Sequence, residues 1–369
     1  MISFKRKQLY GLACDRNHSI LLQADKTKGP SLSSIVAKTD SPVEADVTFP
    51  RLLSSAGNVK GDVNIVLPLE YFEVVSINIP KMPEESVGKT IPYHLGKVFD
   101  KPVSHFIYDW QITHRLKENL KITIYLYPAE EFKKIRTELN KHQLEVTHFE
   151  PDVFSALSYL DQLKRLPAHE PVMCVLLWNN SISLAVFNKN LVAMVRTIMI
   201  NQPTGKTALE QEEITSDSSG EADLHETNEP NLTFYTDSDE TGTSILDDFN
   251  LSISSNISSA PVQDEQTVVP PSVTKEKESQ SESDTTWQKY MAEVNLEIMR
   301  TRDFYSSVLK GGSIESVIVG GGEKDWDRLQ ESFSLLSEFK IEKLFHDAPS
   351  LPCSPLLAAV GQGTLSGWS

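Results

Sequence analysis

A long acidic stretch with few large apolar residues interrupts this chain and limits how it can fold. Residues 208–284 contain 19 Asp and Glu residues, against only Lys275 and Lys277 as bases. Such a stretch cannot bury enough apolar surface to offset the conformational entropy that it would lose on ordering. We therefore expect an acidic disordered insertion over 204–285, lying between two segments that fold together.

The charge outside this stretch is close to balanced. The 369 residues carry a net charge of −16, but removing the stretch leaves 32 acids (51 minus 19) against 33 bases (35 minus 2). A folded part of this kind has no excess of positive charge for binding nucleic acid. Its length is sufficient for two ordinary domains, each with a core of its own.

Cysteine usage and hydropathy indicate a reducing compartment and no membrane span. Cys14, Cys174 and Cys353 are widely spaced in or beside apolar segments, as is typical of buried thiols. Polar residues interrupt the uncharged run 171–188, and prolines, glycines and serines interrupt 348–369, so neither predicts a bilayer segment. No apolar region follows the basic N-terminus, which argues against a signal peptide. We therefore expect a soluble cytoplasmic protein without direct membrane insertion.

Strand-like and helix-like segments alternate along both flanking parts, which favours an α/β fold. The predicted strands are 8–14, 19–24, 63–67, 74–79, 105–111, 121–127, 144–149, 172–177, 183–187, 191–200, 314–319 and 341–345. The predicted helices are 84–99, 129–142, 152–163, 287–309, 325–336 and 356–360.

A series of short phrases in a fixed order carries a family resemblance. The phrases are Lys5-Arg6-Lys7 before a strand that ends at Asp15, Val66-Leu67-Pro68, Ile77 to Pro83, Tyr108-Asp109-Trp110, Val192 to Arg196, Glu297 to Arg300, Val317 to Gly322, and Ala358 to Gly361. In this order they resemble the PilM branch of the actin-like ATPase superfamily, over about 1–203 and 286–367. The cytoplasmic domain of the secretion protein GspL shares the same plan.

The resemblance implies an actin-like (ribonuclease-H-like) α/β fold of two domains. The first domain would span 1–165 and include a small inserted α+β subdomain at about 63–150. The second would combine 166–203 with 286–369. The insertion 204–285 would then interrupt the second domain.

The same resemblance implies a nucleotide site, which in this chain is degenerate. The candidate cofactor-binding residues are Asp15 and the turn Gly320, Gly321 and Gly322. No glycine follows Asp15, and the second phosphate turn, near 177–179, has neither the Asp nor the Gly that phosphate and magnesium binding require. We expect no ATP turnover, no catalytic residue, no metal ligand and no resident cofactor, with ATP the ligand that the resemblance would allow. A tight strand-to-helix turn is the alternative interpretation of the three glycines.

The function implied is that of a non-enzymatic cytoplasmic scaffold in a type IV pilus or type II secretion platform. Its partner would be the cytoplasmic tail of a PilN-like single-span inner-membrane protein, which would hold the scaffold at the membrane; a homodimer is also compatible. The tail would enter a cleft at a sheet edge formed by 63–79, 105–111 and 121–127, unless the chain's own segment 39–51 covers that edge. The alternatives are a nucleotide-binding actin-like ATPase switch and a split GspL-like secretion component.

Replacing residues 208–284 by a short Gly/Ser linker should leave the melting temperature nearly unchanged. The stretch contains only three aromatic residues, Phe234, Tyr235 and Phe249, and so contributes little to a core. Thermal unfolding of the full chain and of the shortened chain tests this expectation. A large loss of stability would contradict it.

Overall fold

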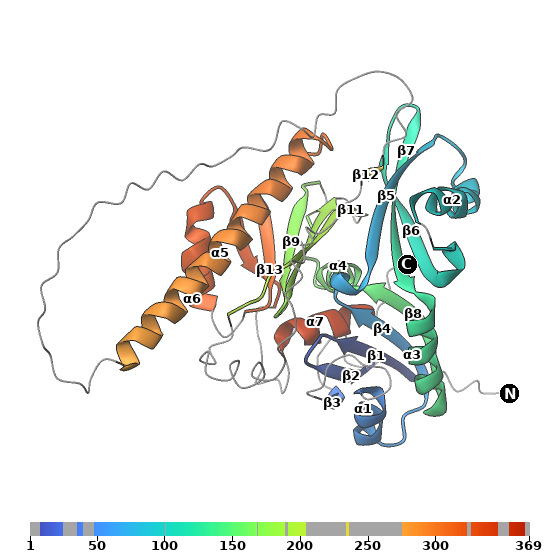
Figure 1. Cartoon of the computed structure of the whole chain (residues 1–369), viewed down its shortest axis with the longest axis horizontal. Helices are drawn as coiled ribbons and strands as arrows, with labels where there is room; N and C mark the ends of the chain where they lie inside the picture. Colours follow the sequence, from blue (N-terminus) through green and yellow to red (C-terminus); the bar gives the residue numbers. More distant parts are fainter. Residues whose placement is uncertain are drawn as a thin grey trace, which may run out of the picture.

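Two α/β halves lie side by side, and a smaller sheet with its own helix extends from the first half (Figure 1). The computed structural model describes residues 8–24, 35–39, 48–99, 101–167, 169–188, 191–203, 234–235, 275–322, 326–345 and 354–365. Most of the insertion expected at 204–285 lies outside these residues. None of the described helices is long and apolar enough to span a bilayer.

The first half is built on a five-stranded mixed sheet in the order β3-β2-β1-β4-β8. Its strands are β1 (Gln8–Cys14), β2 (Ser19–Gln23), β3 (Ile35–Thr39), β4 (Gly61–Leu67) and β8 (Leu144–Pro151). Helices α1 (Thr48–Ala56) and α3 (Ala129–Lys141) contribute apolar residues to the core on one face of the sheet. The other face packs against α4 (Asp152–Gln162) and α7 (Pro355–Thr364).

The smaller sheet has the order β12-β5-β7-β6. Its strands are β5 (Glu73–Pro80), β6 (Phe106–Arg115), β7 (Asn119–Pro128) and the two-residue β12 (Phe234–Tyr235). Helix α2 (Glu84–Val98) covers one face with the buried side chains of Val87, Ile91 and Leu95. Because β4 and β8 pair within the first sheet, the inserted subdomain is shorter than the range 63–150 expected from the sequence.

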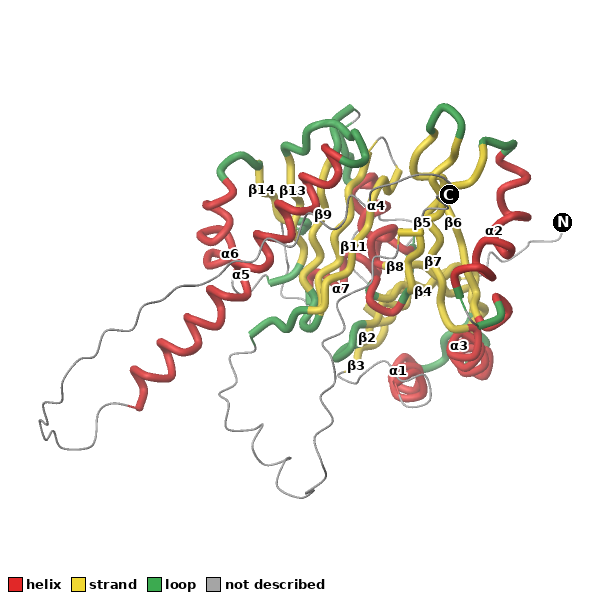
Figure 2. The backbone as a smooth tube through the Cα atoms, turned by 45° about the horizontal axis from the view of Figure 1, so that its top comes forward, coloured by secondary structure: helices red, strands yellow, loops and turns green. Residues whose placement is uncertain are grey.

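The second half contains a five-stranded sheet in the order β11-β10-β9-β13-β14. Its strands are β9 (Val172–Leu177), β10 (Ser181–Asn188), β11 (Leu191–Met199), β13 (Ser316–Gly320) and β14 (Lys340–Lys343). Helices α5 (Lys275–Ser307) and α6 (Trp326–Phe333) pack on one face, as Figure 2 shows, while α4 and α7 pack on the other.

Several elements of the structure differ from the sequence prediction. Helix α5 begins at Lys275 rather than at 287, so it enters the stretch expected to be disordered; Glu, Lys and Gln are good helix formers, and extending a packed helix needs no new nucleus. Strand β3 and helix α1 were not predicted from the sequence. Of the segment 39–51, Thr39 belongs to β3 and residues 48–51 to α1, both in the first half, while residues 40–47 lie outside the described residues. The edge of β5 pairs with β12.

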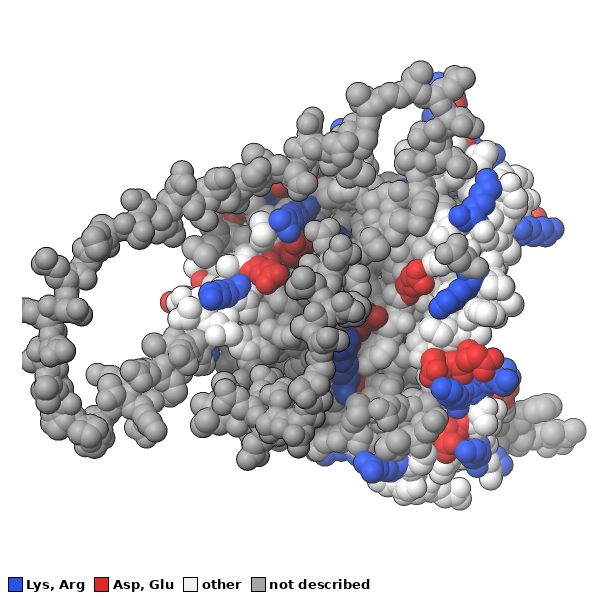
Figure 3. Space-filling view, viewed as in Figure 1, with Lys and Arg blue, Asp and Glu red and all other residues white. Residues whose placement is uncertain are grey.

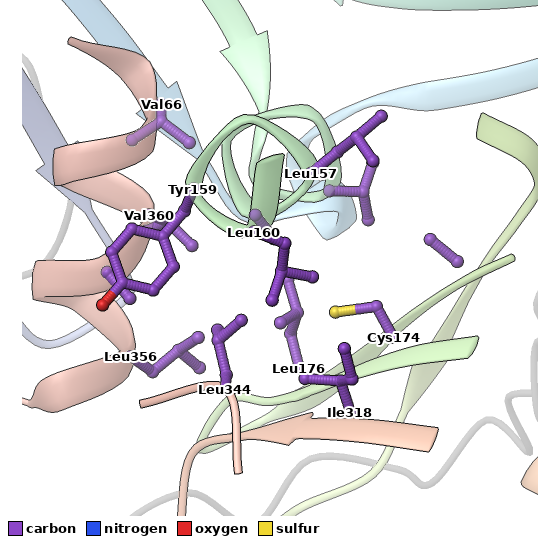
Figure 4. Close-up of a cluster of buried hydrophobic side chains, with 14 of the residues drawn as sticks. Val66, Leu157, Tyr159, Leu160, Cys174, Leu176, Ile318, Leu344, Leu356 and Val360 are labelled. Atoms are coloured by element: carbon purple, nitrogen blue, oxygen red, sulfur yellow. The ribbon is translucent and has the colours of Figure 1, made fainter. Parts of the chain in front are cut away.

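Helices α4 and α7 form the core shared by the two halves. Their apolar side chains meet those of both large sheets, as Figure 4 shows for Val66 of β4, Leu160 of α4, Cys174 of β9 and Val360 of α7. The two helices approach so closely that a Cβ atom on Gly363 would lie 1.9 Å from the carbonyl oxygen of Ser155. Only glycine fits at this crossing.

Replacing Gly363 by Ala should therefore lower the free energy of unfolding by about 3 kcal/mol, because the added methyl group forces the backbones of α4 and α7 apart. Denaturant unfolding measures the change. Gly96→Ala in α2 is the matched control: a Cβ atom there meets nothing within 4 Å, so the stability should stay the same or rise by about 0.5–1 kcal/mol. Equal effects of the two substitutions would contradict the close contact.

Candidate functional site

An apolar groove of about 260 Å³ lies where the first sheet meets the smaller sheet. Its walls come from β6 and β8, each the last strand of its sheet in the described part of the chain. The groove is lined by Phe72, Ile107, Tyr108, Asp109, Trp110, Gln111, Tyr125, Tyr127, His148, Phe149, Glu150, Pro151 and Phe154.

Aromatic rings form the floor of the groove. Phe149 packs against Tyr127 with ring centroids 4.8 Å apart and against Phe72 at 5.5 Å. Tyr125 and Phe154 meet edge to face at 5.0 Å. Interlocked rings of this kind keep their positions and offer apolar surface to an incoming side chain.

Strand β8 contributes a hydrogen-bonded pair of polar side chains to the groove. His148 Nε2 lies 2.9 Å from Glu150 Oε2, and the hydroxyl of Ser155 donates to the other oxygen of Glu150. The hydrogen bond to Glu150 raises the pKa of His148 above its usual value against the opposing effect of burial, and the charges of Glu150 and Asp109 add to the rise. Asp109 is exposed on the opposite wall, so the groove carries two acids against one histidine.

The wall formed by β6 is linked to the second half of the molecule by one side-chain amide that itself lines the groove. Gln111 Nε2 donates to Tyr125 Oη at 2.9 Å and to the carbonyl oxygen of Val192 at 2.7 Å. Because Val192 belongs to β11, this second bond joins the groove to the second half of the molecule.

This arrangement suits an extended peptide. A strand that ends a sheet has backbone groups available for one more strand, and the groove beside it can take side chains. The phrase Tyr108-Asp109-Trp110, singled out in the sequence, lies in this groove. Residues 148–151 were missed as site residues, because nothing in the sequence tells that β8 ends the first sheet.

The first expected nucleotide turn is occupied by its own side chains. Asp15 Oδ1 accepts hydrogen bonds from the backbone N–H groups of Asn17 and His18, both at 2.6 Å. Arg16 turns to Glu70, with Nε 2.9 Å from Oε1. The carboxylate of Asp15 therefore shapes the β1–β2 turn.

The second expected turn is closed by an indole. Trp178, which follows β9, is buried, and its Nε1 donates to Asp152 Oδ2 at 2.6 Å. Ser183 Oγ donates to the same oxygen at 2.7 Å. Asp152 is fully buried, and this burial raises its pKa to about 7, although the hydrogen bonds from Ser183 and Trp178 oppose the rise.

The three glycines serve packing in this structure. Gly321 and Gly322 have φ values of +95° and +65°, which other residues rarely adopt. A Cβ atom on Gly321 would lie 2.2 Å from the carbonyl oxygen of Leu177, and one on Gly320 would lie 2.8 Å from Leu344. These contacts favour the tight turn over a ligand loop.

The predicted site residues thus belong to two separate turns, and neither Asp15 nor the glycines line the groove. Within the described ranges, no group of three or more His, Cys, Asp or Glu side chains could hold a metal ion.

The two large sheets with α4 and α7 between them define a two-domain protein of the actin-like fold, as the sequence predicted. A solved structure described as the PilM–PilN type IV pilus biogenesis complex shares this fold, with a TM-score of 0.60, 15% identity and 98% of each chain covered. The chain is also similar, with a TM-score of 0.37 and 11% identity over 52% of its length and 71% of the other chain, to the cytoplasmic domain of EpsL, an inner-membrane component of the type II secretion system of Vibrio cholerae.

A third similar structure is the ethanolamine utilization protein EutJ of Carboxydothermus hydrogenoformans, with a TM-score of 0.45 and 10% identity over 99% of this chain and 92% of that one. No protein-family model matches the chain. No curated protein matches it in sequence. The resemblance to PilM is confirmed at the level of the fold.

Replacing Asp152 by Asn should change how stability depends on pH between about 4 and 7. An Asp with a raised pKa binds a proton more tightly in the folded state than in the unfolded state, where its pKa is 3.8. Its contribution to the free energy of unfolding is therefore largest below pH 4, falls as pH rises, and levels off above pH 7. Denaturant unfolding of the wild type and of Asp152→Asn across this interval should show this fall in the wild type only.

Subtracting the unfolding free energies of Asp152→Asn from those of the wild type removes the contribution of every group that titrates in both proteins, His148 among them. A wild-type profile parallel to that of the variant would contradict the raised pKa of Asp152.

Proposed function

We propose that this protein is a cytoplasmic scaffold of a pilus or secretion assembly, which docks the cytoplasmic tail of a single-span inner-membrane protein in the groove between β6 and β8. The observation that carries the proposal is the position of this groove between two strands that each end a sheet. Docking there would hold the scaffold at the membrane surface through its partner.

The dimensions of the groove suit a short extended segment. Its volume of about 260 Å³ is just below the range of about 300–1,000 Å³ that small-molecule sites commonly have. An extended peptide would need little of this volume, because its backbone binds along a strand edge and only alternate side chains enter the groove. The aromatic floor around Phe149 would receive an aliphatic side chain.

The charge of the groove favours a basic tail. Asp109 and Glu150 outweigh His148, and cytoplasmic segments next to membrane spans carry an excess of Lys and Arg. Charge complementarity of this kind raises the association rate and selects the partner. On the face seen in Figure 3, described acidic and basic side chains are interspersed. A basic tail would therefore meet no large acidic patch on that face that could bind it in place of the groove.

The comparison with the PilM–PilN complex supports a membrane-assembly role, because a protein of the same fold was solved in that complex. The alternative of an ATPase switch is less well supported. Side chains of the protein itself occupy both expected phosphate turns, and developing charge on a transferring phosphoryl group would meet no prepared donors there. We therefore propose a scaffold that does not turn over ATP.

Synthetic N-terminal tails of membrane proteins encoded beside this gene should bind the full-length chain with a dissociation constant of ~100 μM or lower, equivalent to about −5.5 kcal/mol. Isothermal titration calorimetry measures the affinity. Asp109→Lys should weaken binding of a basic tail, because it reverses the charge of an exposed groove side chain. Ile107→Arg should abolish binding by placing a long charged chain in the apolar part.

Glu85→Lys is the matched control, because it makes the same charge reversal on an exposed position of α2 outside the groove. It should leave the affinity unchanged. The proposal fails if the folded protein binds none of the tails, or if Glu85→Lys weakens binding as much as Asp109→Lys does.

A further inference from the structure

Both walls of the groove are bonded to the second half of the molecule. Strand β8 ends at Pro151 and the chain passes directly into α4 at Asp152, whose carboxylate accepts from Trp178 and Ser183. Strand β6 reaches the same half through Gln111, which donates to the carbonyl oxygen of a β11 residue. The second half therefore contacts both walls of the groove, although β6 and β8 belong to different sheets.

The Asp152 contact joins three segments at one buried carboxylate. Its Oδ1 accepts the backbone N–H of Leu69 at 3.1 Å, in the 3-10 turn η1 (Leu69–Tyr71) between β4 and β5. Its Oδ2 accepts from Trp178, after β9, and from Ser183, in β10. The carboxylate is fully buried, so removing it would leave these donors without an acceptor and away from water.

The contact made by Gln111 also links the groove to the second half. Gln111 lies on the face of β6 that lines the groove, and its amide spans from Tyr125 on the neighbouring strand to β11. The edge-to-face pair of Tyr125 and Phe154 connects the smaller sheet with α4, close to Asp152 in sequence. The walls are thus tied to one another through α4 and to the second half through two hydrogen-bonded side chains.

We infer that the second half acts as a strut that sets the width of the groove, with Asp152 and Gln111 as its positioning residues. The part of this inference that concerns peptide affinity rests on the proposed function. The part that concerns the geometry of the groove does not.

The proposed strut consists of the protein's own side chains. Trp178 lies where the resemblance expects a phosphate turn, yet its indole bonds to Asp152 and brings the end of β9 to the start of α4. The protein's own side chains therefore link the two halves at this turn. Tail binding should accordingly be the same with and without ATP and magnesium.

The first experiment measures amide hydrogen exchange in full-length wild type, Asp152→Ala, Ser183→Ala and Trp178→Phe. Ser183→Ala and Trp178→Phe each remove one hydrogen-bond donor and keep the Asp152 carboxylate. They therefore remain informative if Asp152→Ala does not fold. We expect faster exchange in β8 and β6, as well as at η1 and the 178–181 turn. Asp161→Asn, at an exposed position of the same helix, is the matched control and should exchange like the wild type.

The second experiment measures the affinity of these proteins for the tail peptide that binds the wild type. Asp152→Ala should weaken binding about tenfold, equivalent to about 1.4 kcal/mol, and the single-donor variants should weaken it less. Asp152→Asn keeps one acceptor oxygen and should recover part of the loss. Gln111→Ala should weaken binding while leaving exchange at the 178–181 turn unchanged, because it removes only the contact to β11.

The outcomes separate the two proposals. Failure of every tail to bind the wild type overturns the proposed function, while the exchange data still decide on the strut. Unchanged exchange in β6 and β8 in Asp152→Ala, Ser183→Ala and Trp178→Phe overturns the strut. The strut also fails if the exchange rises but the tail binds each variant as tightly as the wild type, or if ATP and magnesium change the affinity.

Discussion

The packing of α4 and α7 between the two large sheets determines the arrangement of the rest of the molecule. These helices bury apolar side chains against β1, β2 and β4 on one side and against β9, β10 and β13 on the other, so neither half has a complete core without them. The two helices cross closely where Gly363 of α7 meets the backbone of Ser155 in the first turn of α4. Because α4 begins at Asp152, the same packing brings a carboxylate into the junction of the two halves and places strand β8 at the rim of the groove.

A buried carboxylate at such a junction is unfavourable unless it is well bonded. Here the hydrogen bonds come from donors in both halves, so the group is satisfied only while the halves keep their relative position. The raised pKa of Asp152 indicates that the desolvation of the carboxylate is only partly compensated. We infer that this group contributes mainly to the specificity of the arrangement, as the proposed scaffold with a groove of fixed shape would require.

The groove and the altered nucleotide turns are parts of one arrangement. Trp178 and Arg16 would have crowded a phosphate pocket, and in the structure both bond to acidic side chains of the first half. The chain therefore combines an actin-like fold with a junction built from its own side chains. This junction and the groove share α4, whose Phe154 lines the groove two residues after Asp152.

The sequence by itself determined most of the elements and the fold class. Period-2 and helical patterns located most strands and helices within a few residues, because alternating burial and amphipathic packing leave a local signal. It also showed that glycine is missing after Asp15 and at 177–179, where the family resemblance expects phosphate turns, since a missing residue is visible in any context. Only the tertiary structure decided that β4 and β8 leave the inserted subdomain, that Gly320 to Gly322 pack against Leu177 and Leu344, and that Asp152 meets Trp178. The physical reason is that strand order and side-chain contacts between distant segments depend on how the sheets assemble, and no local pattern encodes this.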